Sequence, residues 1–167
     1  MSNSTYILDD KLLASSGSRF LNYILDIIFI FLLIMILAFF FAILANLFDW
    51  TQILIWMETM SDFEGQALFI IIMILYYILT EGFFGRSLAK FITGTIVVDE
   101  NGERPDFGTI FKRNLCRLIP FDAFSFLGSR GWHDSISDTY VVNKKALDEE
   151  LRMFHEFKLI GVQDTND

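Results

Sequence analysis

Two residues of opposite charge stand beside a long apolar run and are the first candidates for chemistry. Arg19 and Asp26 lie seven residues apart, and residues 27–45 contain no polar side chain. On a helix this spacing is two turns, so the two side chains project from the same face. A carboxylate at the centre of a bilayer costs about 2.5–3.5 kcal/mol on insertion scales, so it normally has a partner or a function. The pair therefore indicates either a buried ion pair or a carboxylate that binds a proton or a cation.

Further charged residues could join this pair. Glu81 lies near the end of a second apolar run and should reach the depth of Asp26 if the two runs cross a membrane in opposite directions. An arginine between two carboxylates is stable in a low-dielectric site, because separated charges are unfavourable there. Arginines of a later basic segment offer Asp26 alternative partners. The candidate charged cluster is Arg19, Asp26, Glu81, Arg113, Arg117 and Asp134. The polar residues that could line the same site are Asn22, Tyr23 and Thr80.

Two apolar segments are long enough to hold these residues in a membrane. Of the 167 residues 53% are hydrophobic and 19 are Phe, more than a soluble domain of this size needs. Residues 20–48 exceed the ~20 residues that cross a ~30 Å hydrocarbon core. Residues 67–84 are close to the minimum length for a span. The sequence therefore predicts an all-α membrane protein with two transmembrane helices in a hairpin.

The distribution of basic residues predicts the orientation of this hairpin. All thirteen Lys and Arg residues lie in the first nineteen positions or from Arg86 onward. Residues 49–66 contain four acidic residues and no basic residue. Because basic flanks stay on the cytoplasmic side, we expect both termini in the cytoplasm and the acidic connection outside. The mostly polar residues 1–18 favour an uncleaved membrane helix over a signal peptide.

The segment after the second run carries weaker structural signals. Residues 95–98 form a β-branched run followed by Asn101-Gly102, and residues 139–142 could supply a second strand. We therefore expect a small cytoplasmic β-hairpin-like segment. Residues 107–119 combine one apolar side with basic residues and predict an amphipathic helix in the inner interface, with its Lys and Arg at anionic headgroups. A re-entrant or third transmembrane segment over residues 107–128 is the alternative.

These signals divide the chain into three parts. Residues 1–18 are expected to form a cytoplasmic N-terminal segment, and residues 19–143 a membrane domain. Residues 144–167 are expected to form a cytoplasmic tail, because Leu147, Leu151 and Phe154 have helical spacing among many charges.

Three short motifs follow one another along residues 15–143. The first is Ser18-Arg19-Phe20 with Asp26; the second is residues 85–90 with Gly94, Val97-Val98-Asp99 and Asn101-Gly102; the third is Arg113-Asn114, Arg117 and residues 131–134, leading to residues 139–142. In this order and spacing the motifs resemble the RDD family, small integral membrane proteins named for one Arg and two Asp residues.

The resemblance implies roles for individual residues. It makes Arg19 the family arginine and Asp26 the first aspartate, and it favours Asp134 over Asp138 as the second. Lys90, Trp132 and His133 support the motifs. Where the family usually has Thr-x-Gly-Lys, this chain has Ser87-Leu88-Ala89-Lys90, so Ala89 stands where a glycine would allow a close backbone approach. A bacterial cytoplasmic (inner) membrane location follows from the resemblance, and no substrate does.

Other kinds of site are disfavoured by the sequence. His133-Asp134 invites a catalytic reading, but adjacent residues seldom have that geometry, and no Gly-x-Ser-x-Gly nucleophile accompanies them. The two histidines do not form a metal-ligand spacing. Cys116 is the only cysteine, so neither an intramolecular disulfide nor a cysteine metal site can form. We expect no enzyme activity, no cofactor, no metal and no nucleic-acid partner.

Two functions remain after these exclusions. The first is a structural or accessory subunit of a membrane complex, with the charged cluster at its cytoplasmic side. The alternative is an oligomeric ion or small-solute transporter, resembling a cation/proton antiporter, in which Asp26 is the ion-linked carboxylate. Two spans cannot enclose a pathway, so we expect a homo-oligomer or a larger membrane complex in either case.

Overall fold

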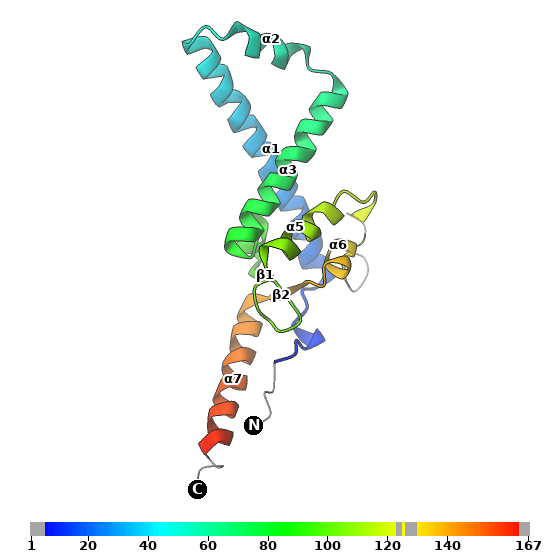
Figure 1. Cartoon of the computed structure of the whole chain (residues 1–167), viewed down its shortest axis with the longest axis vertical. Coiled ribbons are helices and arrows are strands. Elements are labelled where there is room, and N and C mark those ends of the chain that lie inside the picture. The colour runs from blue at the N-terminus through cyan, green and yellow to red at the C-terminus, as the bar shows by residue number, and fades with distance from the viewer. Residues whose placement is uncertain (1–5, 123–124, 126–129, 164–167) are drawn as a thin grey trace.

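The protein is elongated, with its two apolar helices at one end and a polar region at the other. The structure is a computed structural model that describes residues 6–122, 125 and 130–163. In Figure 1, α1 (Ser16–Leu47) and α3 (Asp62–Phe84) meet α2 (Thr51–Thr59) at the end that lies away from both termini. The C-terminal helix α7 (Lys144–Gln163) extends the opposite end.

Both long helices begin at side-chain caps in the polar sequence before each apolar run. The Ser15 hydroxyl accepts a hydrogen bond from the backbone N–H of Ser18, and Ser61 forms a capping box with Glu64. These caps explain why the helices start earlier than the predicted spans, at residues 16 and 62 instead of 20 and 67. Gly85, at φ +70°, ends α3 in the left-handed conformation that glycine tolerates.

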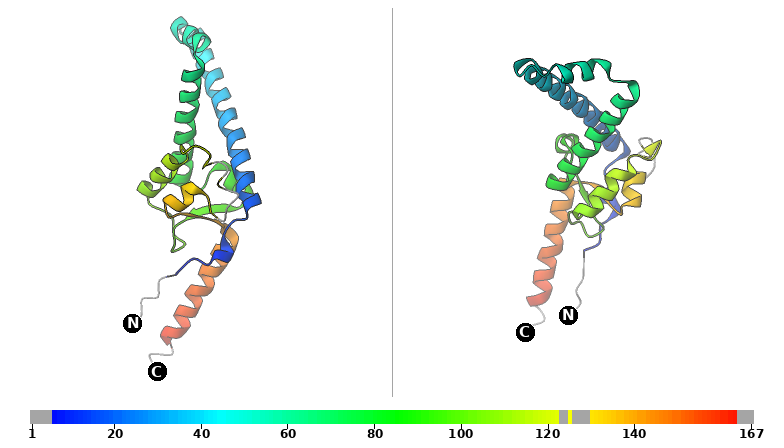
Figure 2. Two further views of the ribbon diagram at one scale, coloured as in Figure 1. Left: turned by 90° about the vertical axis from the view of Figure 1, so that its right-hand side faces the viewer. Right: turned by 45° about the horizontal axis from the view of Figure 1, so that its top comes forward.

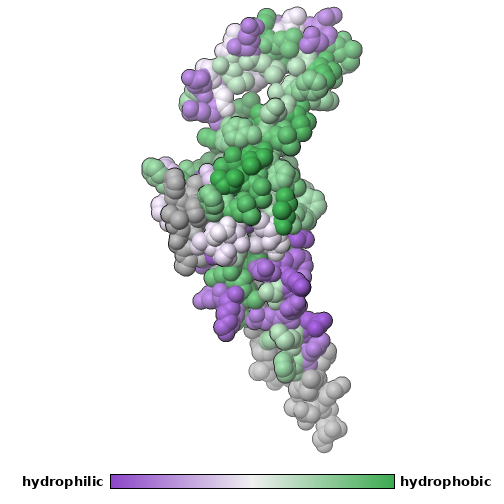
Figure 3. Space-filling model, turned by 180° about the vertical axis from the view of Figure 1, so that it is seen from behind, coloured by the Kyte–Doolittle hydropathy of each residue, from purple (hydrophilic) through white to green (hydrophobic). Residues whose placement is uncertain are grey.

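The two long helices expose most of their apolar surface. In their most hydrophobic windows only 6% of α1 and 17% of α3 is buried, although both are long and apolar enough to cross a membrane. The core helix of a soluble protein would be mostly buried, so these surfaces require an apolar environment. Figure 3 shows the resulting hydrophobic region, with hydrophilic residues above and below it.

The long helices cross and pack over a limited length. Ile30 is fully buried against Tyr76 and Tyr77, and the rings of Phe31 and Phe69 lie 5.4 Å apart. Figure 2 shows the crossing from two further directions. The acidic connection that the sequence predicts between the two long helices contains the short helix α2. Trp56 of α2 is exposed.

A small antiparallel sheet organises the polar end. Strands β1 (Thr95–Val98) and β2 (Tyr140–Asn143) pair with Val97 opposite Val141. The expected antiparallel pair is confirmed, with the second strand one residue later than predicted. The strands are not a hairpin, because α5 (Phe107–Cys116) and α6 (Trp132–Ile136) lie between them in the chain. We call the elements from α4 (Leu88–Thr93) to β2 the polar module.

A second apolar core attaches α7 to this sheet. Leu12, Val98, Val142 and Leu147 are buried together. The ring of Tyr6 packs against Phe154 of α7, with centroids 5.5 Å apart. Leu147, Leu151 and Phe154, for which the sequence predicts helical spacing, therefore lie on a packed face of α7.

Helix α5 differs from the expected interfacial helix in what it buries. It ends at Cys116, before the predicted residue 119. Phe111 and Leu115 of the predicted apolar side are exposed, but Ile110 of that side is buried, and Arg113 and Asn114 are fully buried. Arg113 therefore cannot lie at lipid headgroups, because carboxylates of α3 and α6 hold it inside the protein.

Candidate functional site

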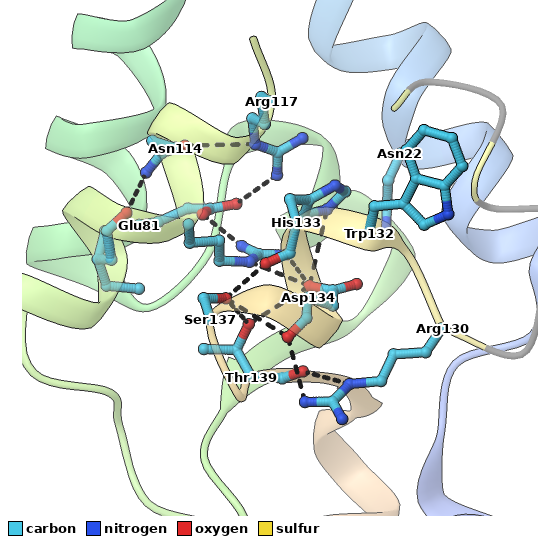
Figure 4. Close-up of polar contacts among 12 residues, drawn as sticks. Asn22, Glu81, Asn114, Arg117, Arg130, Trp132, His133, Asp134, Ser137 and Thr139 are labelled. Atoms are coloured by element: carbon cyan, nitrogen blue, oxygen red, sulfur yellow. Dashed lines mark hydrogen bonds and ion pairs between the residues drawn. The ribbon is translucent and has the colours of Figure 1, made fainter. Parts of the chain in front are cut away.

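Glu81 is the centre of a buried charged network where α3 meets the polar module. Its carboxylate receives hydrogen bonds from Lys90 Nζ at 2.6 Å and from Arg113 Nη1. Arg117 Nη2 lies 3.4 Å from the same carboxylate (Figure 4). The Arg117 guanidinium also lies 4.0 Å from the ring centroid of Tyr77. The carboxylate is fully buried, which is tolerable because each of its oxygens has a cationic partner.

Arg113 joins this carboxylate to a second one. Its Nε and Nη2 donate to the same Asp134 oxygen, at 3.0 and 2.6 Å. Burial lowers the pKa of Arg113, but the carboxylates of Glu81 and Asp134 outweigh it and raise the pKa above its ordinary value. Burial raises the pKa of Asp134, but the Arg113 charge outweighs it and holds the pKa below its ordinary range. Arg113 is thus a charged bridge between α3 and α6.

Asp26 belongs to a separate set of hydrogen bonds. Tyr76 donates its hydroxyl at 2.7 Å, Ser87 donates its hydroxyl at 2.6 Å, and the backbone N–H of Ala89 donates at 3.2 Å. Ala89 is fully buried, so the close backbone approach occurs here without a glycine. These bonds fasten α1 to α3 and to the start of α4. Among the described residues no cation lies within salt-bridge distance of Asp26.

The expected ion pairs of Asp26 are replaced by these neutral donors. Arg19 does not contact Asp26, because two helical turns separate them by about 10 Å along the axis. The other expected partners, Arg113 and Arg117, bind the carboxylates of Glu81 and Asp134 instead. The donors came from Tyr76 and Ser87, which the sequence did not single out as partners.

A polar ladder extends the attachment of α1 along the same face. Asn22 Nδ2 donates to Thr95 Oγ1 at 3.0 Å, and Thr93 Oγ1 donates to Asn22 Oδ1 at 2.6 Å. Asn22, which was expected to line the site, is buried and lines the cavity described below. Thr80 instead donates to the Tyr76 carbonyl within α3.

His133 pairs with an aspartate that the sequence did not single out. Its Nδ1 lies 2.7 Å from Asp122 Oδ2, and its backbone N–H donates to Asp122 Oδ1 at 3.0 Å. Its Nε2 is 3.6 Å from Asp134 (Figure 4). Burial lowers the pKa of His133, and the positive charge of Arg117 adds to this effect. Trp132, beside it, is 47% exposed.

A cavity of about 180 Å³ adjoins the network. Its polar wall includes Arg19, Asp26, Arg117 and His133, and its apolar wall comes from α1 and α3. Within the described residues, Nε and Nη1 of Arg19 are buried and have no hydrogen-bond partner. Tyr23, expected at the site, also lines this cavity.

The arrangement can hold charge but offers no obvious reaction. Among the described residues no group of three or more His, Cys, Asp or Glu side chains could hold a metal ion. The buried charges of Glu81, Lys90, Arg113 and Asp134 pair with one another. A nucleophile activated by a base is not among the contacts described above. What the network can do is fix α3, α4, α5 and α6 against one another, while Asp26 borders open space.

Comparison with known proteins identifies the same family as the sequence motifs. A family model described as the RDD family matches residues 13–143. No curated protein and no solved structure gives a significant match. The matched residues include α1, α3, the polar module and every ion pair described above.

Proposed function

The chain belongs to the RDD family, which is membrane-associated, and on that premise we propose that it is a non-catalytic structural or accessory subunit of a membrane complex. Its two candidate membrane helices are joined to a polar module whose charges are internally paired. A subunit of this kind presents apolar helices to lipid or to partner helices. Its polar module holds the adjoining ends of α1 and α3 in a fixed geometry.

The proposed topology is a transmembrane hairpin of α1 and α3 in a bacterial inner membrane, with both termini in the cytoplasm. Its support is the charge distribution: basic residues occur only in the parts of the chain before Phe20 and after Gly85. Both termini lie at the end opposite α2, the segment without basic residues (Figure 1).

The observation that carries the structural role is the saturation of the Glu81–Arg113–Asp134 network. These three side chains are at most 3% exposed, and each charge has an opposite charge in contact. Removing one partner of such a buried pair typically costs 3–5 kcal/mol, because the other charge is left uncompensated. A group that must bind and release an ion cannot be held so firmly, so this part of the cluster suits a permanent joint.

The proposed complex is testable through the mass of the protein in its own membrane. We expect the full chain, extracted in native lipid discs, to occur in an assembly of defined stoichiometry heavier than one 19.4 kDa chain. Native mass spectrometry of the discs measures this directly. A strictly monomeric chain, with no protein bound at any detergent or lipid ratio, would contradict the subunit role.

A second candidate function is oligomeric ion or small-solute transport, because Asp26 borders the cavity and is held by neutral donors. An intramembrane carboxylate that borders open space and has no cationic partner among the described residues is a candidate ion-binding group. Ion and proton flux in reconstituted vesicles should then fall in Asp26→Asn and persist in Asp10→Asn, a carboxylate outside the cavity. Absence of flux with the wild type would leave the accessory role.

A further inference from the structure

The least satisfied polar group at the cavity is the guanidinium of Arg19. Its Nε and Nη1 are inaccessible and, among the described residues, have no hydrogen-bond partner. Buried donors are normally paired, because a donor removed from water without an acceptor is unfavourable. Because the guanidinium lines the cavity, a ligand there that carries acceptor oxygens would offer it a partner.

The other charges at the cavity do not meet this need. Lys90, Arg113 and Arg117 share Glu81, so their strongest contacts are already made. Asp134 acts electrostatically on Arg19, but it forms its ion pair with Arg113. Among the described residues that line the cavity, Arg19 is therefore the cation with unpartnered donors, and its complement is an anion with several acceptor oxygens. Phosphate is such an anion, and its oxygens are strong acceptors for a guanidinium.

The apolar part of the cavity wall restricts the kind of phosphate compound that fits. It is formed by Ile27, Ile30, Phe69 and Met73, all of them apolar side chains of α1 and α3. A free inorganic phosphate would leave this wall without a partner. A ligand with a phosphate at one end and hydrocarbon at the other would cover both walls.

The position of Arg19 along α1 favours a membrane source for that ligand. It lies in the first turns of α1, directly before the apolar run, and under the proposed membrane placement this is the level of the lipid headgroups. The assignment of a membrane lipid to the cavity rests on that placement and not on the subunit role.

We propose that the cavity binds one phospholipid of the inner leaflet, with the Arg19 guanidinium donating to the lipid phosphate. The first part of an acyl chain then lies against Ile27 and Met73. Bound in this way, the lipid would join α1 and α3 at the point where they leave the polar module.

The test uses the full chain, delipidated in detergent and titrated with phosphatidylglycerol. Native mass spectrometry measures the retained lipid, and diacylglycerol with the same chains and inorganic phosphate serve as competitors. We expect one retained phosphatidylglycerol that neither competitor displaces. Arg19→Gln should lower retention about tenfold or more, as expected for the loss of a charge-assisted hydrogen bond.

A matched control separates this site from general headgroup attraction. Arg86 also has a buried Nε without a partner among the described residues, but it lies outside the cavity and stacks on Phe91 at 4.1 Å. Arg86→Gln should therefore retain lipid as the wild type does. If Arg19→Gln does not accumulate as folded protein, Ile27→Trp, which fills the apolar wall without changing charge, should lower retention instead.

Four outcomes would overturn the proposal. These are unchanged retention in Arg19→Gln and Ile27→Trp, equal loss in Arg86→Gln, displacement by inorganic phosphate alone, and equal binding of diacylglycerol. The third would identify a soluble-anion site and the fourth a purely apolar one. The same spectra report the oligomeric state, so failure of the lipid site and failure of the subunit role are distinguished.

Discussion

The Tyr76 hydroxyl of α3 donates a 2.7 Å hydrogen bond to the Asp26 carboxylate of α1, and the same hydroxyl accepts the backbone N–H of Leu88 at 3.1 Å. One phenol therefore connects both apolar helices and the start of α4. Its ring also packs against Tyr77 and Ile30 in the contact between α1 and α3. The crossing of the two helices is thus fixed by a hydrogen bond that lies within their apolar contact.

Tyr76→Phe should destabilise the protein while preserving this ring packing. It removes a donor to a carboxylate and leaves the Leu88 N–H without its acceptor, so we expect a loss of about 1.5–3 kcal/mol. Thermal unfolding in mild detergent measures the difference. Tyr23→Phe is the control, because Tyr23 lines the same cavity but is not one of the donors to Asp26. Equal melting of the two variants would contradict the role of the Tyr76–Asp26 bond.

Arg113→Met should be the most destabilising single change in the polar module. It removes the bridge between Glu81 and Asp134 and leaves the latter without its ion pair, a loss of about 3–5 kcal/mol. Its neighbour Lys112 is exposed and provides a control, Lys112→Met, that changes the same charge at the surface. Denaturant titration followed by Trp fluorescence measures both. The bridging role is refuted if the two variants unfold together.

Stability should fall as the pH drops below the ordinary His value. Burial lowers the pKa of His133, so the unfolded chain takes up this proton at higher pH than the folded protein does. The stabilisation is therefore full at pH 8 and declines through about pH 6.5, where an unfolded His titrates. Melting temperatures between pH 8 and 5 should show this decline in the wild type.

The control variants assign this decline to one histidine. His133→Gln should remove the pH dependence in that interval, while His155→Gln, at an exposed position of α7, should keep it. The interval ends at pH 5 so that the carboxylates stay ionised, since their ordinary values are near 4. A decline that persists in His133→Gln would assign it to another group.

The glycine that ends α3 should resist substitution more than the one that ends α4. Gly85 and Gly94 both have φ +70°, so Ala at either position is expected to cost about 1–2 kcal/mol of backbone strain. A Cβ at Gly85 would also lie 3.2 Å from Arg104 Nε, whereas Gly94 has open space. Thermal melting should therefore rank Gly85→Ala below Gly94→Ala. A higher melting temperature for Gly85→Ala than for Gly94→Ala would contradict a cost from the Arg104 contact.

Most of the apolar architecture could be predicted from the sequence. The unbroken hydrophobic runs predict α1 and α3, and their serine caps explain why both helices begin earlier than the runs do. The β-branched segments predict the two strands, because Val and Thr favour extended backbone. The loop over residues 49–66 was less predictable, since α2 is short and has no side-chain cap.

The charged residues at the base of the helices could be selected from the sequence, but their partners could not. Glu81, Arg113 and Asp134 were expected in one cluster, and the structure brings them together. The expected partners of Asp26 were arginines, and its actual donors are Tyr76, Ser87 and a backbone N–H. Any of these polar groups could satisfy a buried carboxylate, so residue type alone does not choose among them.

The sequence by itself determined that two long helices must be covered by an apolar medium, because apolar runs of that length leave no polar face that could be exposed to water. Only the tertiary structure decided which charges meet. Hydrogen bonds and ion pairs act over about 3–4 Å, and such distances arise only after α3, α4, α5 and α6 have packed. That packing turned Arg113 inward, gave Asp26 neutral donors, and left Arg19 facing a cavity.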